Sequence, residues 1–255
     1  MGSKHSILKH LVDCLPAEIN TFRDIFCGSG VVSLNVEAKK YRLTDITEKL
    51  IELHLNLSDM NFCSHALDVS NLYLNDKESY YRLRDDYNAD PCPAKFLCLI
   101  YRSFSNQMRF NRKGEFNLPY GERNIFSWMR IMKHWNFSKN ANVEFAVSDF
   151  KIELANCAED DFVFMDPPYY NSVATYNDGW DEDDEFELYS ATEKLKCKWI
   201  MTNTLENRGV PNPFLEDFIA DNDYYVYPIN SSFTYDNFRK TDHKKKEVII
   251  TNYKV

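Results

Sequence analysis

The sequence predicts an α/β fold with a helical insertion. Two apolar segments, residues 21–26 and 161–165, read as strands, and each runs directly into residues that turn the chain. Glycines follow the first segment and two prolines follow the second. Between the two strands, apolar residues recur at helical spacing and without the alternation of a strand: Phe96, Leu97, Leu99, Ile100, Phe104 and Met108.

Composition excludes several classes of protein. Hydrophobic residues at 44% and aromatic residues at 15% can build a core, which excludes a disordered chain. No segment approaches the ~18–20 apolar residues that span a bilayer, and the N-terminal residues lack the features of a secretory signal. The seven cysteines are an odd number without a CxxC pair. We therefore expect a reduced, cytoplasmic protein without a metal, in the host cytoplasm if a virus encodes it.

The net charge of −9 argues against a protein that simply coats nucleic acid, but the charges are segregated. Residues 102–139 hold eight Lys or Arg against two acids, whereas residues 159–190 hold eleven acids and no base. A second basic run covers residues 239–246. Such segregation lets an acidic protein offer a polyanion one cationic face, although a solvated helix and a solvated loop would give the same pattern.

The first predicted strand ends at Gly28 and Gly30, in a strand-to-helix turn whose helix is expected to begin at Val31. Without a Cβ, the backbone at these glycines can approach a ligand closely. The next predicted strand, residues 41–44, ends at Asp45, which is placed to accept hydrogen bonds from a ribose diol. A tight turn explains the glycines alone, and Asp45 at this offset favours a nucleoside cofactor.

The buried strand 161–165 leads into Asp166-Pro167-Pro168-Tyr169. The prolines force the chain out of the sheet and present the Asp166 carboxylate, a proline carbonyl and the Tyr169 ring together, at the end where α/β folds bind ligands. Two acceptors on the N–H groups of a planar exocyclic amine localise its lone pair, and an aromatic ring stacks on the base. The segment therefore indicates alkylation of a base amine.

The sequence resembles the Dam family of DNA adenine-N6 methyltransferases, most closely its T-even phage type, nearly from end to end. The most specific match is residues 109–121, RFNRKGEFNLPYG, to the family segment R-[YFI]-N-x-x-G-x-F-x-x-P-[FY]-G. The other matches follow the family's α order: Gly2-Ser3-Lys4, Phe26-Cys27-Gly28-Ser29-Gly30, Thr44-Asp45-Ile46, Ser148-Asp149-Phe150, Asp166 to Tyr169, and Thr202-Asn203.

The resemblance implies an organisation and an activity. Residues 1–54 and 138–255 would form a Rossmann-like S-adenosylmethionine-dependent methyltransferase sheet with its last strand at 246–251, and residues 55–137 an inserted helical target-recognition domain. The implied reaction moves a methyl group from S-adenosyl-L-methionine to adenine N6 in duplex DNA, at GATC or a related short site, and leaves S-adenosyl-L-homocysteine. No metal, membrane or obligate protein partner is expected.

The resemblance also implies roles for individual residues. Asp166 and the Pro167 carbonyl would hold the target amine, and Tyr169 would stack on the flipped base. The implied cofactor residues are Lys4, Asp24, Phe26, Gly28, Gly30, Asp45, Asp149 and Phe150. The implied DNA-binding residues are Arg109, Arg112, Lys113, Asn117 and Pro119. A helix cap for Asp149, core packing for the two phenylalanines and a solvated Lys4 are the competing interpretations.

Three departures from the family leave other functions open. The family's residues upstream of G-x-K, which help at the base pocket, have no counterpart here, and Gln107 stands where relatives have an apolar residue. The acidic run 178–187 lies near the expected DNA path, unless its aspartates cap a helix. The alternatives are a catalytically inactive DNA-binding relative and an RNA or protein N-methyltransferase, which would not need residues 109–121.

Overall fold

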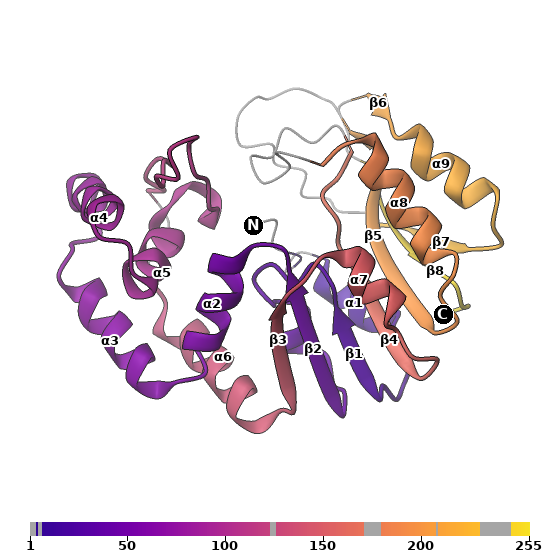
Figure 1. Ribbon diagram of the computed structural model, residues 1–255, viewed down its shortest axis with the longest axis horizontal. Helices are drawn as coiled ribbons and strands as arrows, with labels where there is room; N and C mark the ends of the chain where they lie inside the picture. Colours follow the sequence, from indigo (N-terminus) through magenta and orange to yellow (C-terminus); the bar gives the residue numbers. More distant parts are fainter. Residues whose placement is uncertain (1–3, 5–6, 123–125, 171–179, 208, 230–245) are drawn as a thin grey trace. The chain divides into compact units, whose positions relative to one another are not determined.

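Contacts between residues divide the chain into two compact units. One spans residues 47–145 and is mostly helical, and the other combines residues 3–46 with 146–255 and carries most of the sheet (Figure 1). The expected boundaries, at 54/55 and 137/138, both lie inside the first unit. The structure, a computed structural model, describes residues 4, 7–122, 126–170, 180–207, 209–229 and 246–255. In these ranges, no helix is both long and apolar enough to cross a membrane.

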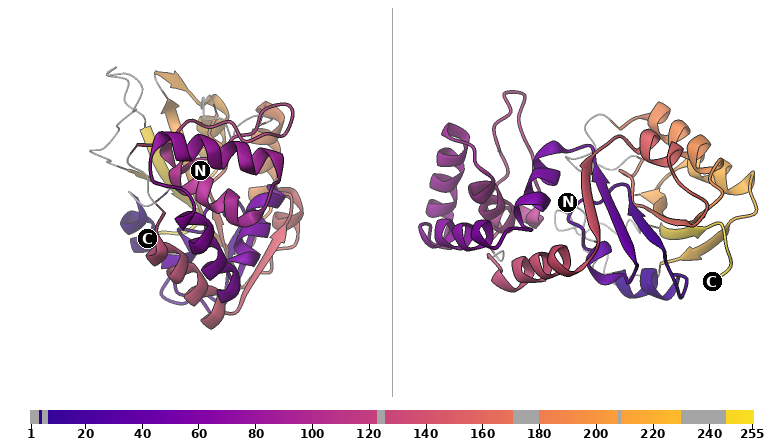
Figure 2. Two further views of the ribbon diagram at one scale, coloured as in Figure 1. Left: turned by 90° about the vertical axis from the view of Figure 1, so that its left-hand side faces the viewer. Right: turned by 60° about the horizontal axis from the view of Figure 1, so that its bottom comes forward.

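Within the described residues, eight strands form one sheet: β1 (Thr21–Asp24), β2 (Lys40–Asp45), β3 (Val143–Val147), β4 (Asp161–Met165), β5 (Lys198–Asn207), β6 (Val210–Pro211), β7 (Tyr225–Pro228) and β8 (Lys246–Thr251). Their order is β3-β2-β1-β4-β5-β8-β7, with β6 beside β5 (Figures 1 and 2). The pairs β1–β2, β1–β4 and β4–β5 are parallel, and β8 runs antiparallel between β5 and β7. The predicted α/β fold is confirmed.

The strand order reverses at β1. The chain proceeds from β1 to β2 and β3 on one side, and later to β4 and β5 on the other. Open α/β sheets bind ligands beyond the carboxyl ends of their strands at such a reversal. Asp24 ends β1, Asp45 ends β2, and Asp166 directly follows β4. Three of the predicted site residues therefore lie at the edge where a ligand is expected.

Three helices pack on strands β4, β5 and β8 of the sheet. α7 (Phe150–Ala155), α8 (Glu182–Thr192) and α9 (Pro213–Ala220) lie in a row, and their apolar side chains pack with those of β4, β5 and β8 in one core. Because β4 is buried along its whole length, its sequence shows no alternation. Near the N-terminus, α1 (Leu8–Asp13) buries Leu11.

A buried ionic network joins three strands to α7. Glu153, 2% exposed, accepts hydrogen bonds from Arg23 on β1 at 2.9 Å and from Arg42 on β2 at 2.7 and 2.8 Å. Arg23 also donates to Asp161 on β4 at 3.0 Å. Burial alone would raise the pKa of Glu153, but hydrogen bonds from Arg42, Ser148 and Arg23 outweigh it and lower that pKa to about 2.

The helix expected from Val31 is not present. A 3-10 turn, Ser33–Asn35, replaces it, and Val36 is already extended with φ −110° and ψ 142°. The segment between Gly30 and β2 is short and contains β-branched valines, which favour extended backbone over helix. The turn places the Ser33 hydroxyl against Asp24, with consequences for the site described below.

The helical unit contains α2 (Glu48–Asn56), α3 (Met60–Asn71), α4 (Lys77–Ala89), α5 (Pro93–Arg102) and α6 (Trp128–Asn140). α5 is the central helix, because α2, α3 and α4 all pack against it. Pro93 lies in its first turn, where a missing N–H removes no helical hydrogen bond. Of the apolar residues whose spacing predicted a helix, those from Phe96 to Ile100 lie in α5 and are buried in the core of this unit. Phe104 and Met108 lie beyond the end of α5, in a 3-10 turn and in the segment after it, so for them the helix prediction is wrong.

A buried histidine pair connects the first and last helices of this unit. Nδ1 of His54 on α2 and Nε2 of His134 on α6 are 2.7 Å apart, so one ring donates its N–H to the other. Both rings stack on Phe145. Burial, followed by the neighbouring His54, lowers the pKa of His134 to about 3. His134 is therefore neutral at physiological pH, and the pair acts as a structural contact.

The Glu153 network predicts a specific dependence of stability on pH. A glutamate whose pKa falls from 4.5 to about 2 on folding contributes about 3 kcal/mol above pH 5, and this contribution is lost as the pH falls toward 2. We expect Glu153→Gln to lower the free energy of unfolding by about 3 kcal/mol at pH 7. The difference from wild type should narrow steadily below pH 5 in urea unfolding followed by circular dichroism.

Glu159→Gln provides the matched control. Glu159 pairs with Lys196 at 3.5 Å, but both side chains are more than three-quarters exposed, so the change should cost less than about 1 kcal/mol. A deficit of Glu153→Gln that stays constant from pH 7 to pH 3 would contradict the assigned role of the network.

Candidate active site

The loop after β1 adopts the backbone conformation that its glycines allow. Gly28 and Gly30 have φ of +50° and +68°, in the left-handed region that other residues avoid. The Gly28 N–H donates to the Asp45 carboxylate at 3.1 Å, which joins the ends of β1 and β2. Among the described residues, a Cβ added to Gly28 would meet only the Phe26 carbonyl, at 3.8 Å, so the φ of this glycine and not a lack of space is what requires it.

Asp24, at the end of β1, is 1% exposed, and its two carboxylate oxygens differ in their contacts. Its Oδ2 accepts the Ser33 hydroxyl at 2.6 Å, while its buried Oδ1 has no hydrogen-bond partner among the described residues. Burial raises the pKa of Asp24 to about 7, with the Ser33 hydrogen bond opposing and the carboxylates of Asp166 and Asp45 adding to the rise. A buried oxygen in this state is a place for a donor supplied by a ligand.

Asp149 and Phe150 open helix α7. Asp149 Oδ1 accepts the Lys151 N–H at 2.8 Å, so the helix-cap interpretation of Asp149 is confirmed for that oxygen. Phe150 is 7% exposed and stacks on Phe26, with ring centroids 5.6 Å apart and an interplanar angle of 29°. The core-packing interpretation therefore also holds for Phe150, whose ring packs against the residue that precedes the glycine loop.

Three donors converge on one oxygen of Asp166. Oδ1 lies 2.8 Å from the Lys4 ammonium, 2.7 Å from the Thr202 hydroxyl and 3.2 Å from the Tyr169 hydroxyl. Thr202 is on β5, so the contact fixes Asp166 against the neighbouring strand. The carboxylate is thus held from one side by a cation and two hydroxyls.

Lys4 is buried, 8% exposed, so a solvated position is wrong. Its ammonium donates to the Tyr169 hydroxyl at 2.5 Å and lies 4.6 Å from the centroid of that ring. Burial opposes a charge on Lys4, but Asp166 and Tyr169 outweigh it and raise the pKa of Lys4 above its ordinary value. The structure brings Lys4 to Asp166 and Tyr169, and its contact with a cofactor stays a prediction. Gly2 and Ser3 lie outside the described residues.

In the helical unit, residues 103–120 form a hairpin-like excursion after α5. Isolated antiparallel bridges join Ser103 to Tyr120 and Phe110 to Phe116. On the returning side the residues alternate: Phe116 and Leu118 are buried at 1% and 3%, while Pro119 is exposed. The buried pair anchors the excursion in the core of the unit and turns its other residues away from that core.

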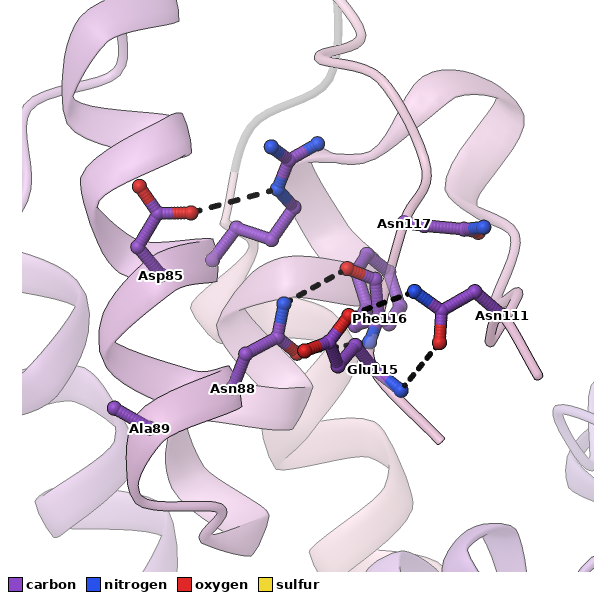
Figure 3. Close-up of a pocket in the computed structure, with 8 residues that line it drawn as sticks. Asp85, Asn88, Ala89, Asn111, Glu115, Phe116 and Asn117 are labelled. Atoms are coloured by element: carbon purple, nitrogen blue, oxygen red, sulfur yellow. Dashed lines mark hydrogen bonds and ion pairs between the residues drawn. The ribbon is translucent and has the colours of Figure 1, made fainter. Parts of the chain in front are cut away.

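Helix α4 clamps this excursion from the side. The Asn88 carboxamide accepts the Phe116 N–H at 2.8 Å and donates to the Phe116 carbonyl at 3.1 Å (Figure 3). Between α4 and the excursion lies an open pocket of about 460 Å³, lined by residues of both charges. Asn111, which also lines this pocket, stabilises the turn of the excursion: its side-chain oxygen accepts the N–H groups of Lys113 and Glu115 at 2.9 and 3.1 Å.

Apart from the exposed Pro119, the predicted DNA-binding residues fall into two groups in residues 103–120. Nε of Arg109 donates to the Asn117 side-chain oxygen at 2.7 Å, and Nη2 donates to the Asn117 carbonyl at 2.9 Å. The structure therefore brings these two together. Arg112 and Lys113 lie instead in the exposed turn. Both groups remain candidates for DNA contact.

These features can be compared with known proteins. A model of the D12 class N6 adenine-specific DNA methyltransferases matches residues 1–248. The chain belongs to this family. The modification methylase StsI of Streptococcus sanguinis is 28% identical over 99% of this chain and 42% of its own length. The type II methyltransferase M.FokI of Planomicrobium okeanokoites is 29% identical over 99% of this chain and 42% of its own length. The retron Ec67 DNA adenine methylase of Escherichia coli is 30% identical over 75% of this chain and 70% of its own length.

The chain spans about two fifths of the length of the StsI and FokI relatives. The family uses S-adenosylmethionine. Three carboxylates at the edge of the sheet in this chain fit that molecule. Its amino group, ribose diol and adenine amine are all hydrogen-bond donors, and Asp24, Asp45 and Asp149 present carboxylates at or just beyond the strand ends. The buried Oδ1 of Asp24, which has no hydrogen-bond partner in the part of the chain that the structure describes, is the observation that favours this fit.

Part of the acidic run after Tyr169 is explained by the start of helix α8. Asp181 and Asp184 form a capping box at the start of α8, so the helix-cap interpretation is confirmed for them. Asp178 and the basic residues 239–245 lie outside the described residues.

Residues for which the sequence indicated no role also contact predicted site residues. Thr202 holds Asp166, and Ser33 holds Asp24. Trp180 packs on Phe26 and Phe150. Glu185 does not contact a predicted site residue itself but binds Trp180. Thr202 was recognised only as part of a motif after the fifth strand. Trp180 and Glu185 stand within or beside the acidic run, whose charge drew attention to its surface. The sequence did contain one signal, a tryptophan among acids shortly after Asp166-Pro167-Pro168-Tyr169.

Proposed function

We propose that this chain transfers a methyl group from S-adenosylmethionine to adenine N6 in duplex DNA. One observation supports it above the others: Asp166 is bound on a single oxygen by Lys4, Thr202 and Tyr169, at the edge of the sheet where the strand order reverses. A carboxylate held in this way offers its second oxygen to a target amine. Membership of the D12 class supports adenine N6 as that amine.

The residues act on the target base by orienting its amine. Oδ2 of Asp166 and the carbonyl of Pro167 accept the two N–H groups, which draws the nitrogen lone pair out of the ring. Tyr169 stacks on the flipped base. When bound, S-adenosylmethionine supplies the methyl group as an electrophilic sulfonium. The amine becomes acidic only after it is methylated, so its proton leaves after the transfer, and the charged Lys4 does not take it.

A tritium assay tests the proposal. The 255-residue chain is incubated with [methyl-³H]S-adenosylmethionine and duplex DNA free of adenine methylation, and the DNA is digested to nucleosides. We expect the label in N6-methyladenine. Label in RNA or in a protein substrate but not in DNA would point to the alternative methyltransferase. DNA binding without transfer would indicate an inactive relative, and either result would overturn the proposal.

Asp166→Ala should abolish methylation while cofactor and DNA binding stay largely intact. Losing one preorganised acceptor costs ~10²–10³ in rate. Because the change also removes the carboxylate partner of buried Lys4, Asp166→Asn serves as the second variant, with thermal unfolding to check the fold. Asp160→Ala, an exposed neighbour before the same strand, should leave turnover unchanged. Near-wild-type turnover in both Asp166 variants would contradict the mechanism.

Thr202→Val should lower the turnover number about tenfold, because Asp166 loses one of the donors that orient it while the volume of the side chain is kept. Thr202→Ser restores the hydroxyl and should recover most of the rate. The Michaelis constants for both substrates should change by less than about twofold in each variant. Equal losses in Val and Ser would mean that Thr202 serves packing and does not position Asp166.

The proposed target is GATC or a closely related site, and Arg109 is the proposed guanine reader. Asn117 engages the side edge of the guanidinium, Nε and Nη2, which directs the end edge away from Asn117. An end edge of this kind matches O6 and N7 of guanine. Arg112 and Lys113 in the exposed turn would contact phosphates, and exposed Pro119 would pack on a base or sugar.

Arg109→Ala should reduce discrimination at one base position by about 1–3 kcal/mol when GATC and its single-base variants are compared as substrates. Asn117→Ala should move discrimination in the same direction, because it releases the guanidinium. Lys113→Ala should instead weaken all sequences alike and flatten the salt dependence. If Arg109→Ala lowers every substrate by the same factor, Arg109 is a backbone contact and the assignment fails.

A further inference from the structure

Trp180 belongs to the aromatic cluster that contains two of the predicted cofactor residues. Its ring centroid lies 5.8 Å from that of Phe26, edge to face at 77°, and 5.5 Å from that of Phe150, tilted at 50°. Phe26 immediately precedes the glycine loop and Phe150 follows Asp149. Trp180 therefore adds a third ring to the two that these segments contribute, although it comes from another part of the chain, just before the N-cap of α8.

Glu185 fixes the polar edge of that ring. It lies in the first turn of α8 among four acids, but it alone of the four is fully buried, at 0% exposed. Its Oε1 accepts the Trp180 indole N–H at 2.9 Å, and its Oε2 accepts the Tyr189 hydroxyl. Burial raises the pKa of Glu185, whereas the hydrogen bonds from Tyr189 and Trp180 oppose that rise.

The other end of this contact is anchored in the sheet. Tyr189 accepts a hydrogen bond from the Asn203 side chain at 3.1 Å, and Asn203, on β5, is fully buried. Asn203 follows Thr202, which holds Asp166, and successive residues of a strand point to opposite faces. The middle of β5 thus supports Asp166 on one face and, through Tyr189 and Glu185, Trp180 on the other.

Such a chain of contacts restricts the indole more than ring packing alone. Edge-to-face and tilted contacts contribute about 0.5–1.5 kcal/mol each and tolerate several orientations. A hydrogen bond to a buried carboxylate is directional and is costly to leave unmade. The orientation of Trp180 against Phe26 and Phe150 is therefore set from Glu185.

We infer that Glu185 is a positioning residue of the cofactor pocket, which acts by holding the Trp180 indole against Phe26 and Phe150. This inference rests on the proposed function, because it assigns S-adenosylmethionine to that pocket. Glu185 does not touch the cofactor, so its removal should weaken cofactor binding only through Trp180. The target amine and the DNA contacts should be unaffected.

A double-mutant cycle on cofactor affinity tests this route. Binding of S-adenosylhomocysteine is measured by titration calorimetry for wild type, Glu185→Leu, Trp180→Phe and the double variant. Glu185→Leu keeps volume but loses both acceptor oxygens, and Trp180→Phe keeps a ring but loses the N–H. We expect about tenfold weaker binding for Glu185→Leu in the wild-type background and less than about twofold in the Trp180→Phe background.

Further variants keep the test decisive. Asp183→Asn removes an exposed carboxylate from the same turn and should leave affinity unchanged. Glu185→Gln retains one acceptor oxygen and should fall between wild type and Glu185→Leu. If Glu185→Leu does not fold, as judged by thermal unfolding, Glu185→Gln replaces it in the cycle with a smaller expected loss. At saturating S-adenosylmethionine, the turnover number of the folded variants should stay within about twofold of wild type.

The outcomes separate this inference from the function on which it rests. Wild-type protein that does not bind S-adenosylhomocysteine would overturn the proposed function itself. Wild-type binding together with equal losses from Glu185→Leu in both backgrounds would show that Glu185 acts independently of Trp180, and would overturn the inference alone. Unchanged affinity in Glu185→Leu would do the same.

Discussion

The position of the site depends on one buried carboxylate, Glu153. It binds arginines from two neighbouring strands, and one of these arginines also reaches Asp161 at the start of β4. Burying this much charge is unfavourable unless every partner is in place, so the network tolerates only one arrangement of β1, β2, β4 and α7. Each of these elements ends at, begins at or directly precedes a predicted site residue. The network thereby sets the spacing of Asp24, Asp45, Asp149 and Asp166.

That spacing concentrates negative charge at the edge of the sheet. Asp24, Asp45 and Asp166 are close enough for the latter two to help raise the pKa of Asp24 to about 7. Lys4 compensates at Asp166, but the described residues offer no hydrogen-bond donor to Oδ1 of Asp24. A site built this way favours a cationic ligand that brings its own donors. The sulfonium and amino group of the proposed cofactor have that character.

The sequence predicted those parts of the fold that local chemistry determines. The bounds of β4 agree to the residue, because a short apolar run followed by two prolines has one interpretation. The bounds of β8 also agree, but the family resemblance implied them. The helix after Gly30 was wrong, since glycine turns resemble one another in sequence whether a helix or a 3-10 turn follows. Asp149 and Asp181 were correctly suspected of capping helices, because an acid before a helix is itself a local signal.

Contacts between distant segments lay beyond the reach of the sequence. Lys4 and Asp166 are separated by 162 positions, and the motif that suggested Lys4 gave no indication of its partner. Within the acidic run, nothing in the composition distinguishes buried Glu185 from its exposed neighbours. Glu185 is buried because it lies on the face of α8 that also carries Tyr189, and this face packs against Trp180 and β5. The residues proposed to contact a ligand thus stand in recognisable motifs, whereas the residues that orient them do not.

The residues that orient the predicted site share a physical principle. Asp166 is bound through Oδ1, and Arg109 through Nε and Nη2, so each two-sided group is held by the protein on one side. A side chain held on one side has already lost its rotational freedom, and a ligand that meets the other side does not have to compensate for that loss. The same partners exclude alternative rotamers that would turn the functional edge inward. Orientation before binding is therefore supplied in both units by short polar contacts, and it is these contacts, more than the groups that face the ligand, that determine how well each group is aimed.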